Sequence, residues 1–269
     1  MSPAVALVAP LYDADGGLLE VAAPLWPLLR ELYCEIIVEA SRQTPPHVLA
    51  AYREAGALVF SEFEAPNNIA HLGQVRLRAL QRAVARGHSC LHLCDWDRAL
   101  HWARTFPDEL RTVLPAIPDY DFLVMGRTRR AFDSHPHAQR ETEHLANEAF
   151  AAITGEPFDV SGGSRGVSAT AAVALQRWSR VFGVGSDGEW PVLAHRLGLR
   201  CGWFAAEGLE FETADRFAAA IAAAGSYEAW LARAANNGAG WVRRLEFAAA
   251  IAAGAFDAAT RTDLPDGTM

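Results

Sequence analysis

The stretch that decides the fold reads Leu91-His92-Leu93-Cys94-Asp95-Trp96-Asp97-Arg98. An apolar, strand-like run ends there in two aspartates spaced by one residue, followed by an arginine. Two carboxylates at the end of a buried strand repel each other unless a positive charge lies beside them. We therefore predict that Asp95 and Asp97 hold a divalent cation. The alternative is an acidic loop that is ion-paired with Arg98.

The composition indicates an ordinary folded globule. Of the 269 residues, 51% are apolar and 21% are charged, which is enough to bury a sizeable core in one large domain or in one domain with an appended helical part. The net charge of -8 argues against a nucleic-acid partner. None of the 24 basic residues is lysine, which excludes Schiff-base chemistry and a phosphate-loop lysine. Any phosphate is then bound by metal, arginine or backbone amides.

The sequence predicts neither a signal peptide nor a membrane helix. An apolar run over residues 4–9 has no basic region before it and is closed by Pro10, so it is typical of a first strand. No stretch approaches the ~18 uninterrupted apolar residues that a membrane helix needs. We therefore expect a cytoplasmic protein without an integral membrane segment, in which the cysteines are reduced.

Strand-like and helix-like segments alternate in the first half of the chain. Buried strands are predicted at Ala4–Leu11, Glu35–Glu39, Ala57–Ser61, Cys90–Cys94 and Asp121–Met125. The helices predicted between them are Gly16–Leu32 (kinked or split at Pro24 and Pro27), Pro45–Gly56, Asn67–Arg86 and Trp102–Leu114. Strands separated by helices of this length predict crossover units and an α/β fold with a parallel sheet.

The second half of the chain has a different character. We predict an exposed loop over Gly126–Glu143, and a strand over Phe158–Gly163 that ends in a glycine turn. The remaining predicted elements are the helices His144–Ile153, Ala169–Trp178 and Glu189–Leu197, the strand Arg200–Phe204, Ala-rich helices from Asp215 onward and a frayed end over Thr260–Met269. These patterns suggest a main domain over residues 1–212 and a C-terminal helical extension over residues 213–269.

Polar side chains gather where the predicted strands end. They are Tyr12 and Asp13 after the first strand, Glu39 and Ser41 after the second, and Asp95 and Asp97 after the fourth. In an open parallel sheet, ligands bind outside the carboxyl ends of the strands. A hard cation such as Mn²⁺ or Mg²⁺ takes oxygen ligands from one or two carboxylates together with substrate phosphates. This edge of the sheet is therefore the predicted site.

Short motifs follow one another in a consistent order over residues 4–212. They are Pro10-Leu11-Tyr12, Glu39-Ala40-Ser41, Gly73-x-x-Arg76-x-x-Ala79, Asp95-Trp96-Asp97, Ser161-Gly162-Gly163-Ser164-Arg165-Gly166 and Gly185-Ser186-Asp187-Gly188-Glu189-Trp190. This ordered set resembles the GT-A glycosyltransferases. The resemblance implies a Rossmann-like, mostly parallel sheet flanked by helices, to which the Ala-rich C-terminal helices are an addition. One departure is Glu39, where the family usually has an aspartate.

The resemblance also implies a function and the residues that carry it. The function is a metal-dependent transfer of a sugar from a nucleotide-diphosphate sugar to a small soluble acceptor, with Mn²⁺ or Mg²⁺ as cofactor. The implied nucleotide-sugar contacts are Pro10, Tyr12, Glu39, Ser41, Arg76 and Asp95. The implied metal ligands are Asp95 and Asp97, with His101 as a candidate third. The implied acceptor contacts are Gly162, Gly163, Arg165 and Trp190.

Two acids are candidates for catalysis. If the enzyme inverts the sugar, Asp187 or Glu189 would be the base that deprotonates the acceptor hydroxyl. The alternative is structural, because an acid in the first turn of a helix interacts favourably with the helix dipole.

Two polar clusters lie outside these motifs. The first can supply a metal ligand or an acceptor contact, or form a solvated loop: Asp133, His135, His137 and His144. The second can bind a phosphate or carboxylate of the acceptor, or coat the surface: Arg127, Arg129 and Arg130.

Two other functions stay open at this point. A sugar-phosphate nucleotidyltransferase has a similar sheet and metal, but its glycine-rich first loop and lysine are missing here. A catalytically silent nucleotide-binding protein would keep the fold alone. A homodimer is compatible with the sequence.

Overall fold

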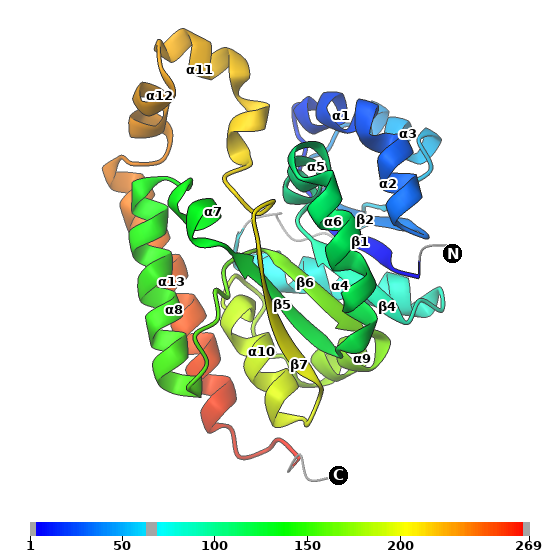
Figure 1. The fold of residues 1–269 in the computed structure, drawn as a ribbon, viewed down its shortest axis with the longest axis vertical. Helices are drawn as coiled ribbons and strands as arrows, with labels where there is room; N and C mark the ends of the chain where they lie inside the picture. The colour runs from blue at the N-terminus through cyan, green and yellow to red at the C-terminus, as the bar shows by residue number, and fades with distance from the viewer. Residues whose placement is uncertain (1–3, 63–68, 266–269) are drawn as a thin grey trace.

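A seven-stranded sheet forms the centre of the computed structural model, which describes residues 4–62 and 69–265 (Figure 1). The strand order is β3-β2-β1-β4-β6-β5-β7. Only β6, which is antiparallel to both β4 and β5, departs from the parallel arrangement within this sheet. The strands are β1 (Ala6–Leu11), β2 (Ile36–Ala40), β3 (Leu58–Phe60), β4 (Cys90–Cys94), β5 (Phe122–Arg127), β6 (Ser164–Ser168) and β7 (Cys201–Ala206).

Helices cover both faces of the sheet, and each face has its own apolar core. One core contains residues of α1 (Gly17–Ala22), α2 (Trp26–Leu32), α3 (Pro46–Glu54), α5 (Trp96–Thr105) and α6 (Pro107–Val113). The other contains residues of α4 (Leu72–Ala85), α8 (His137–Thr154), α9 (Ala169–Trp178), α10 (Ser186–Arg196) and α13 (Gly238–Thr260). Strand β1 is buried on both faces, which is why its sequence is continuously apolar.

The predictions for the first half of the chain are largely confirmed. All five predicted strands form, and the proline-containing first helix is split into α1 and α2 by the short 3-10 helix η1 (Ala23–Leu25). The predicted start of the next helix at Asn67 lies outside the described residues. Its described part begins with η2 (Ile69–His71) and continues as α4. The α/β class follows from this alternation.

The helix after β4 begins earlier than predicted. Helix α5 starts at Trp96, with Asp95 in an extended conformation just before it and Asp97 in its first turn, where the helix dipole favours an acid. The predicted helix Trp102–Leu114 is in fact α5 followed by α6, because Pro107 ends the first helix at the preceding residue. Both acids are thus positioned by the start of a helix.

The predicted loop over Gly126–Glu143 is wrong. It contains α7 (Arg129–Asp133) and the first turns of α8. The buried face of α8 carries polar residues, such as Gln139, Thr142 and Glu143, so its helical period has no apolar signature there. The predicted strand over Phe158–Gly163 is also wrong, since β6 follows the glycine turn instead of preceding it.

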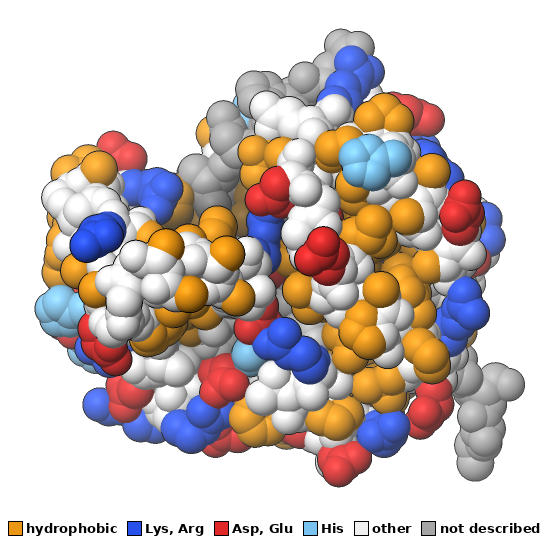
Figure 2. Space-filling model, turned by 90° about the horizontal axis from the view of Figure 1, so that it is seen from above, with side chains coloured by type: hydrophobic (Ala, Val, Ile, Leu, Met, Phe, Trp, Pro, Cys, Tyr) orange, Lys and Arg blue, Asp and Glu red, His pale blue; other side chains and the backbone are white. Residues whose placement is uncertain are grey.

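The C-terminal helices differ in how they pack. Helix α13 lies along α8 and α10 and contributes Ile251 and Ala255 to the core, whereas α11 (Ala218–Ala224) and α12 (Tyr227–Ala234) project beyond the sheet (Figure 1). The boundary at residue 212 stays a prediction. Seen from above, the surface is hollowed between two lobes, with acidic and basic side chains along the hollow (Figure 2). No helix within the described ranges is long and apolar enough to cross a membrane.

Candidate functional site

A cavity of about 240 Å³ opens at the carboxyl ends of β1 and β4. It is lined by Pro10, Tyr12, Leu18, Leu72, Asp95, Trp96, Asp97 and Arg216. The structure therefore brings together four predicted site residues, because β1 and β4 are parallel neighbours whose ends meet at one edge. Arg216, from the 3-10 helix η4 (Thr213–Arg216), was not predicted and adds a cation to the lining.

Asp95 is ion-paired, but with Arg76 instead of Arg98. The Arg76 Nη2 atom lies 2.8 Å from Asp95 Oδ2, and its Nε donates to Oδ1 at 3.1 Å. Arg76 is only 4% exposed, and Nη1 of the same side chain donates to Asp187 at 2.8 Å. One buried arginine thus neutralises Asp95 and ties it to the start of α10.

The glycine turn packs directly against the two aspartates. The carbonyl of Gly163 accepts a hydrogen bond from the Asp95 amide at 3.2 Å, and the carbonyl of Gly162 accepts from Arg98 Nη1 at 2.9 Å. Gly163 has φ +67°, and a Cβ atom there would lie 2.9 Å from Arg98 Nε. These glycines shape the wall of the acidic site through their backbone.

Asp97 lies among acids. Burial, followed by the negative charges of Glu212 and Asp95, raises the pKa of Asp97 to about 7. Glu212 is 6% exposed, and its Oε2 atom is buried without a hydrogen-bond partner. Its other oxygen lies 3.7 Å from Arg98 Nη2. Two carboxylates therefore share a single arginine, which leaves an excess of negative charge at this point.

The acidic group fits a cation whose remaining coordination positions are filled by substrate phosphates and water. No group of three or more His, Cys, Asp or Glu side chains converges as a metal site within residues 4–62 and 69–265. Mn²⁺ and Mg²⁺ are commonly held by one or two carboxylates, with the remaining positions filled by substrate phosphates and water. The unpartnered Oε2 of Glu212 and the raised pKa of Asp97 are the features expected where a positive charge is missing.

Glu212 was missed by the sequence analysis. It lies in the segment that follows β7 (Cys201–Ala206) but not directly after the strand, so no acid at a strand end indicates it in the sequence.

His101 does not fit the role of metal ligand. Its Nδ1 atom lies 2.8 Å from Asp215 Oδ2, and its Nε2 atom lies 3.1 Å from Glu210 Oε1. Burial alone would lower the pKa of His101, but hydrogen bonds and charge from Asp215, together with Glu210, outweigh burial and raise it. Both ring nitrogens already have carboxylate partners, which leaves neither for a metal, so this prediction is corrected.

The two candidate bases have structural partners. Asp187 accepts from Arg76 and lies 3.5 Å from Arg165 Nη2, with 8% of its surface exposed. Glu189 is fully buried, and it accepts from Ser179 Oγ at 2.5 Å and from the Arg180 amide at 2.7 Å. Glu189 thus holds the loop before α10 in place and cannot meet an acceptor hydroxyl, which contradicts its role as a base.

Two predicted acceptor contacts also lie in the interior. Arg165 is 3% exposed and donates to the carbonyl of Ser164 at 2.6 Å and to that of Val160. Trp190 is 2% exposed, belongs to the apolar core and donates from Nε1 to Ser179 Oγ at 3.0 Å. Neither side chain faces the cavity, so both predictions are corrected: these residues support the site from within the fold.

Glu39 lies beside the cavity at the end of β2, in register with Pro10. It is fully buried, and its carboxylate lies 3.3 Å from Arg78 Nε and 3.7 Å from Arg82 Nε. Ser41 is nearby in sequence, but its hydroxyl oxygen accepts from the Gln43 amide at 3.2 Å and so supports the turn after β2.

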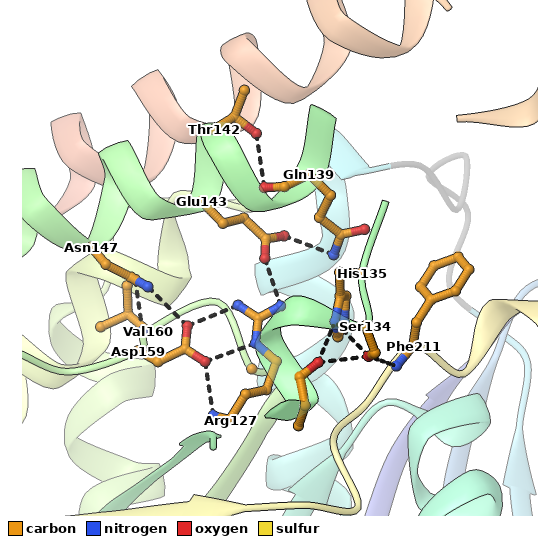
Figure 3. Close-up of polar contacts among 12 residues, drawn as sticks. Arg127, Ser134, His135, Gln139, Thr142, Glu143, Asn147, Asp159, Val160 and Phe211 are labelled. Carbon is orange, nitrogen blue, oxygen red and sulfur yellow. Dashed lines mark hydrogen bonds and ion pairs between the residues drawn. The ribbon is translucent and has the colours of Figure 1, made fainter. Parts of the chain in front are cut away.

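The three arginines at the end of β5 and directly after it are all ion-paired. Arg127 is held by Asp159 at 2.8 Å and by Glu143 at 2.7 Å, in the buried network drawn in Figure 3. Arg129 pairs with Asp133 at 2.6 Å. Arg130 pairs with Glu207 and Glu210. Each arginine thus has its own carboxylate partners, although Arg127 and Arg129 line one cavity together with Arg140.

The predicted histidine cluster is dispersed. His135 is buried at 3% exposure, His137 packs edge-on against Trp241, and His144 is exposed. The histidines therefore do not form one ligand set.

Comparison with known proteins gave matches only among solved structures. No protein-family model matches the chain, and neither does any curated protein. The glucosyl-3-phosphoglycerate synthase of M. tuberculosis superimposes with a TM-score of 0.52 and 18% identity, over 75% of this chain and 70% of that one. The mannosyl-3-phosphoglycerate synthase of Rubrobacter xylanophilus gives a TM-score of 0.46 and 17% identity, over 83% and 73% of the two chains.

The first of these matches shows the fold. The alignment covers 75% of this chain, and the sheet found here has the β3-β2-β1-β4 order of a Rossmann-like α/β protein, with helices on both faces. The chain therefore has the GT-A fold that its ordered motifs resemble.

Proposed function

We propose that this protein is a metal-dependent glycosyltransferase, which moves a sugar from a nucleotide-diphosphate sugar to a small acceptor. The observation that carries the proposal is the set of incompletely neutralised carboxylates, Asp97 and Glu212, beside a cavity at the carboxyl edge of a GT-A sheet. Ligands of open α/β sheets bind at that edge. Excess negative charge there suits a cation together with a diphosphate.

The lining of the cavity suits a nucleotide. Pro10 and Tyr12 provide an apolar and aromatic wall, and Tyr12 is 45% exposed, so its ring is available for stacking on a base. Glu39, predicted as a nucleotide contact, lies beside Pro10 on the neighbouring strand but is fully buried and paired with Arg78, so it supports this wall from within the fold. Arg216 lines the same cavity and can meet a phosphate, since arginine matches phosphate oxygens as a fork of donors.

Asp97 would hold Mn²⁺ or Mg²⁺, with Asp95 beside it. A bound cation of this kind offsets the negative charge that grows on the departing diphosphate. The residues of the chain hold the two aspartates in position. Arg76 fixes the Asp95 carboxylate, and the turn at Gly163 holds the aspartate backbone. The proposal assigns no general base, because Asp187 is engaged by arginines and Glu189 is enclosed.

The fold comparison agrees with this proposal. The solved protein with the TM-score of 0.52 is itself a sugar-adding synthase by name. Its name suggests phosphoglycerate as one acceptor to include in a test of this chain. The homodimer and the cytoplasmic location remain predictions.

The test is a panel of UDP-, GDP- and ADP-sugars incubated with the full chain, with and without Mn²⁺. The measurement is the release of nucleoside diphosphate with and without mixed acceptors. The proposal expects release with at least one donor, dependent on the metal and increased by an acceptor. Failure of every donor to bind or react would reject it in favour of a protein that has the fold without the activity.

A further inference from the structure

Helix α13 lies at one flank of the molecule and has two apolar faces, of which the chain covers only one (Figure 1). The covered face packs against α8 and α10 and includes Ile251 and Ala255. On the other face, Val242, Leu245 and Phe256 are 58%, 48% and 60% exposed. A helix at the surface of a protein normally presents charged and polar side chains to water, so the second face is unusual.

The apolar residues of this second face form a continuous stripe. They follow one another at intervals of three or four positions, which places them on one side of a helix: Val242, Leu245, Ala249, Ala252 and Phe256. We call these five residues the α13 stripe. Between Glu246 and Asp257 the helix has no charged or polar side chain. Exposed apolar patches of this kind mark interaction sites.

The α13 stripe is symmetric about Ala249, which is exposed and small. Val242 lies seven positions before Ala249 and Phe256 lies seven positions after it. Leu245 lies four positions before Ala249, and the exposed Ala253 lies four positions after it. A second copy of α13, placed antiparallel across the stripe, would therefore bring a larger and a smaller side chain together at each level. In a two-fold dimer each such contact occurs twice.

The charges beside the stripe favour the same arrangement. The side chains of Arg243 and Asp257 are exposed, and neither has an ion-pair partner within residues 4–62 and 69–265. Arg243 lies six positions before Ala249 and Asp257 eight positions after it, so antiparallel pairing brings the arginine of one copy near the aspartate of the other. Parallel pairing would instead place identical charges side by side, where they repel.

A lipid surface fits the α13 stripe less well than a second copy of the chain. Helices that lie on membranes have polar faces rich in lysine and arginine. The exposed charged residues of α13 are one arginine and two acids: Arg243, Glu246 and Asp257.

We infer that two copies of this chain form a dimer through α13, antiparallel about a two-fold axis at Ala249, with Val242 of each copy packed on Phe256 of the other. Leu145 of α8 is 58% exposed and enlarges the apolar surface of the helix pair, since α8 packs along α13. No residue of α13 lines the donor cavity, so the inference does not depend on the proposed function.

The first test is the molecular mass of the full chain, measured by analytical ultracentrifugation over a range of concentrations. The wild type is expected to approach twice 29.1 kDa. Leu245→Glu places a charge in the contact and should weaken the dimer at least tenfold. Val173→Glu is the matched control, because Val173 is 54% exposed on α9, and its dimer should equal that of the wild type.

Two results of this test would overturn the inference. One is a wild type that stays monomeric at every concentration, and binding of that monomer to phosphatidylglycerol vesicles would assign the stripe to a lipid surface instead. The other is a dimer that is equally stable in Leu245→Glu, provided that circular dichroism shows the variant to be folded.

The second test is the orientation of the two helices, measured by disulfide cross-linking with diamide. All variants carry Cys34→Ser, because Cys34 is exposed. Ala249→Cys should cross-link two copies, since the axis passes through this position. Val242→Cys alone should not, because the two Val242 positions lie about 21 Å apart along the antiparallel pair at ~1.5 Å per residue. Adding Phe256→Cys to Val242→Cys should restore the cross-link.

The cross-linking result decides the orientation independently of enzyme activity. Cross-linking of Val242→Cys alone, or none of Ala249→Cys, would overturn the antiparallel dimer and leave the glycosyltransferase proposal intact. Failure of nucleotide binding in the wild type would reject the glycosyltransferase proposal and leave the dimer intact.

Discussion

Arg76 and Asp187, 111 positions apart in the chain, are joined by an ion pair of 2.8 Å. The same guanidinium holds both oxygens of Asp95. Helix α4, the end of β4 and the start of α10 are therefore connected at one buried point. This connection fixes the position of Asp95 before any ligand arrives.

Replacing Arg76 with Leu should destabilise the protein strongly. Two carboxylates would lose their counter-charge in a largely buried setting, which costs about 3–5 kcal/mol in comparable cases. The measurement is the free energy of unfolding in urea at pH 7. Arg111→Leu is the control, since Arg111 pairs with Asp108 and Glu31 at an exposed position. Equal stability of the two variants would contradict the structural role of Arg76.

Gly163→Ala should weaken the site as well as the fold. Its φ of +67° disfavours a side chain, and the added Cβ would press on Arg98 Nε at 2.9 Å and Asp95 Oδ2 at 3.0 Å. Gly225→Ala is a matched control, with φ +83° and no atom within 4 Å of the added carbon. Both variants should lose about 1–2 kcal/mol from backbone strain. Only Gly163→Ala should also reduce metal-dependent nucleotide binding, by about tenfold, in a titration followed by calorimetry.

Glu189→Gln should lower stability and leave turnover intact. The amide keeps one acceptor oxygen in place of two, and it loses the charge that faces Arg261 at 3.6 Å. The thermal midpoint is expected to fall, while kcat per folded molecule stays within about twofold of wild type. A normal midpoint with turnover reduced a hundredfold would restore Glu189 as a candidate base.

His101 should make stability depend on pH. Glu210 and Asp215 accept from its two nitrogens, Arg104 shares Asp215, and Glu212 adds further negative charge. Because the pKa of His101 is raised in the folded protein, its contribution is complete below the usual value of 6.5 and is lost as pH rises through the folded pKa.

The thermal midpoint of the wild type should therefore fall across that range relative to that of His101→Gln. His195→Gln, at an exposed position, should follow the wild type. Parallel curves for the wild type and His101→Gln would argue against a charged His101.

The site residues that could be predicted from the sequence are those that lie at the ends of strands. Tyr12 and Asp95 end apolar runs, and parallel neighbours bring such ends to one edge, so their meeting in one cavity needed no knowledge of side-chain contacts. The sheet itself was predictable for the same reason. Runs of Val, Ile and Leu between amphipathic helices are compatible with few folds other than a parallel sheet covered by helices.

The remaining site residues depend on long-range pairing that leaves no local pattern. Nothing near Glu189 in the sequence indicates that its carboxylate accepts a hydrogen bond from the Arg180 amide in the loop before α10. Asp187 lies two residues away in the same helical turn, yet its partner is Arg76. Helix α8 was hidden because its first buried side chains are polar, and the charge of one of them, Glu143, is neutralised by Arg127 and Arg244 from other elements. Such neutralisation is visible only once the chain is folded.

The measurement that tests the central claim most directly is calorimetric titration of UDP and GDP into wild type and Asp97→Asn, with Mn²⁺ and with EDTA. The wild type should bind one of the nucleotides in Mn²⁺ and lose at least tenfold in affinity in EDTA. Asp97→Asn should bind weakly in both conditions while its thermal midpoint stays at or above that of wild type, because an acid crowded by Glu212 and Asp95 has been removed. Tight nucleotide binding that is the same in EDTA, or undiminished in Asp97→Asn, would contradict a metal held at this site.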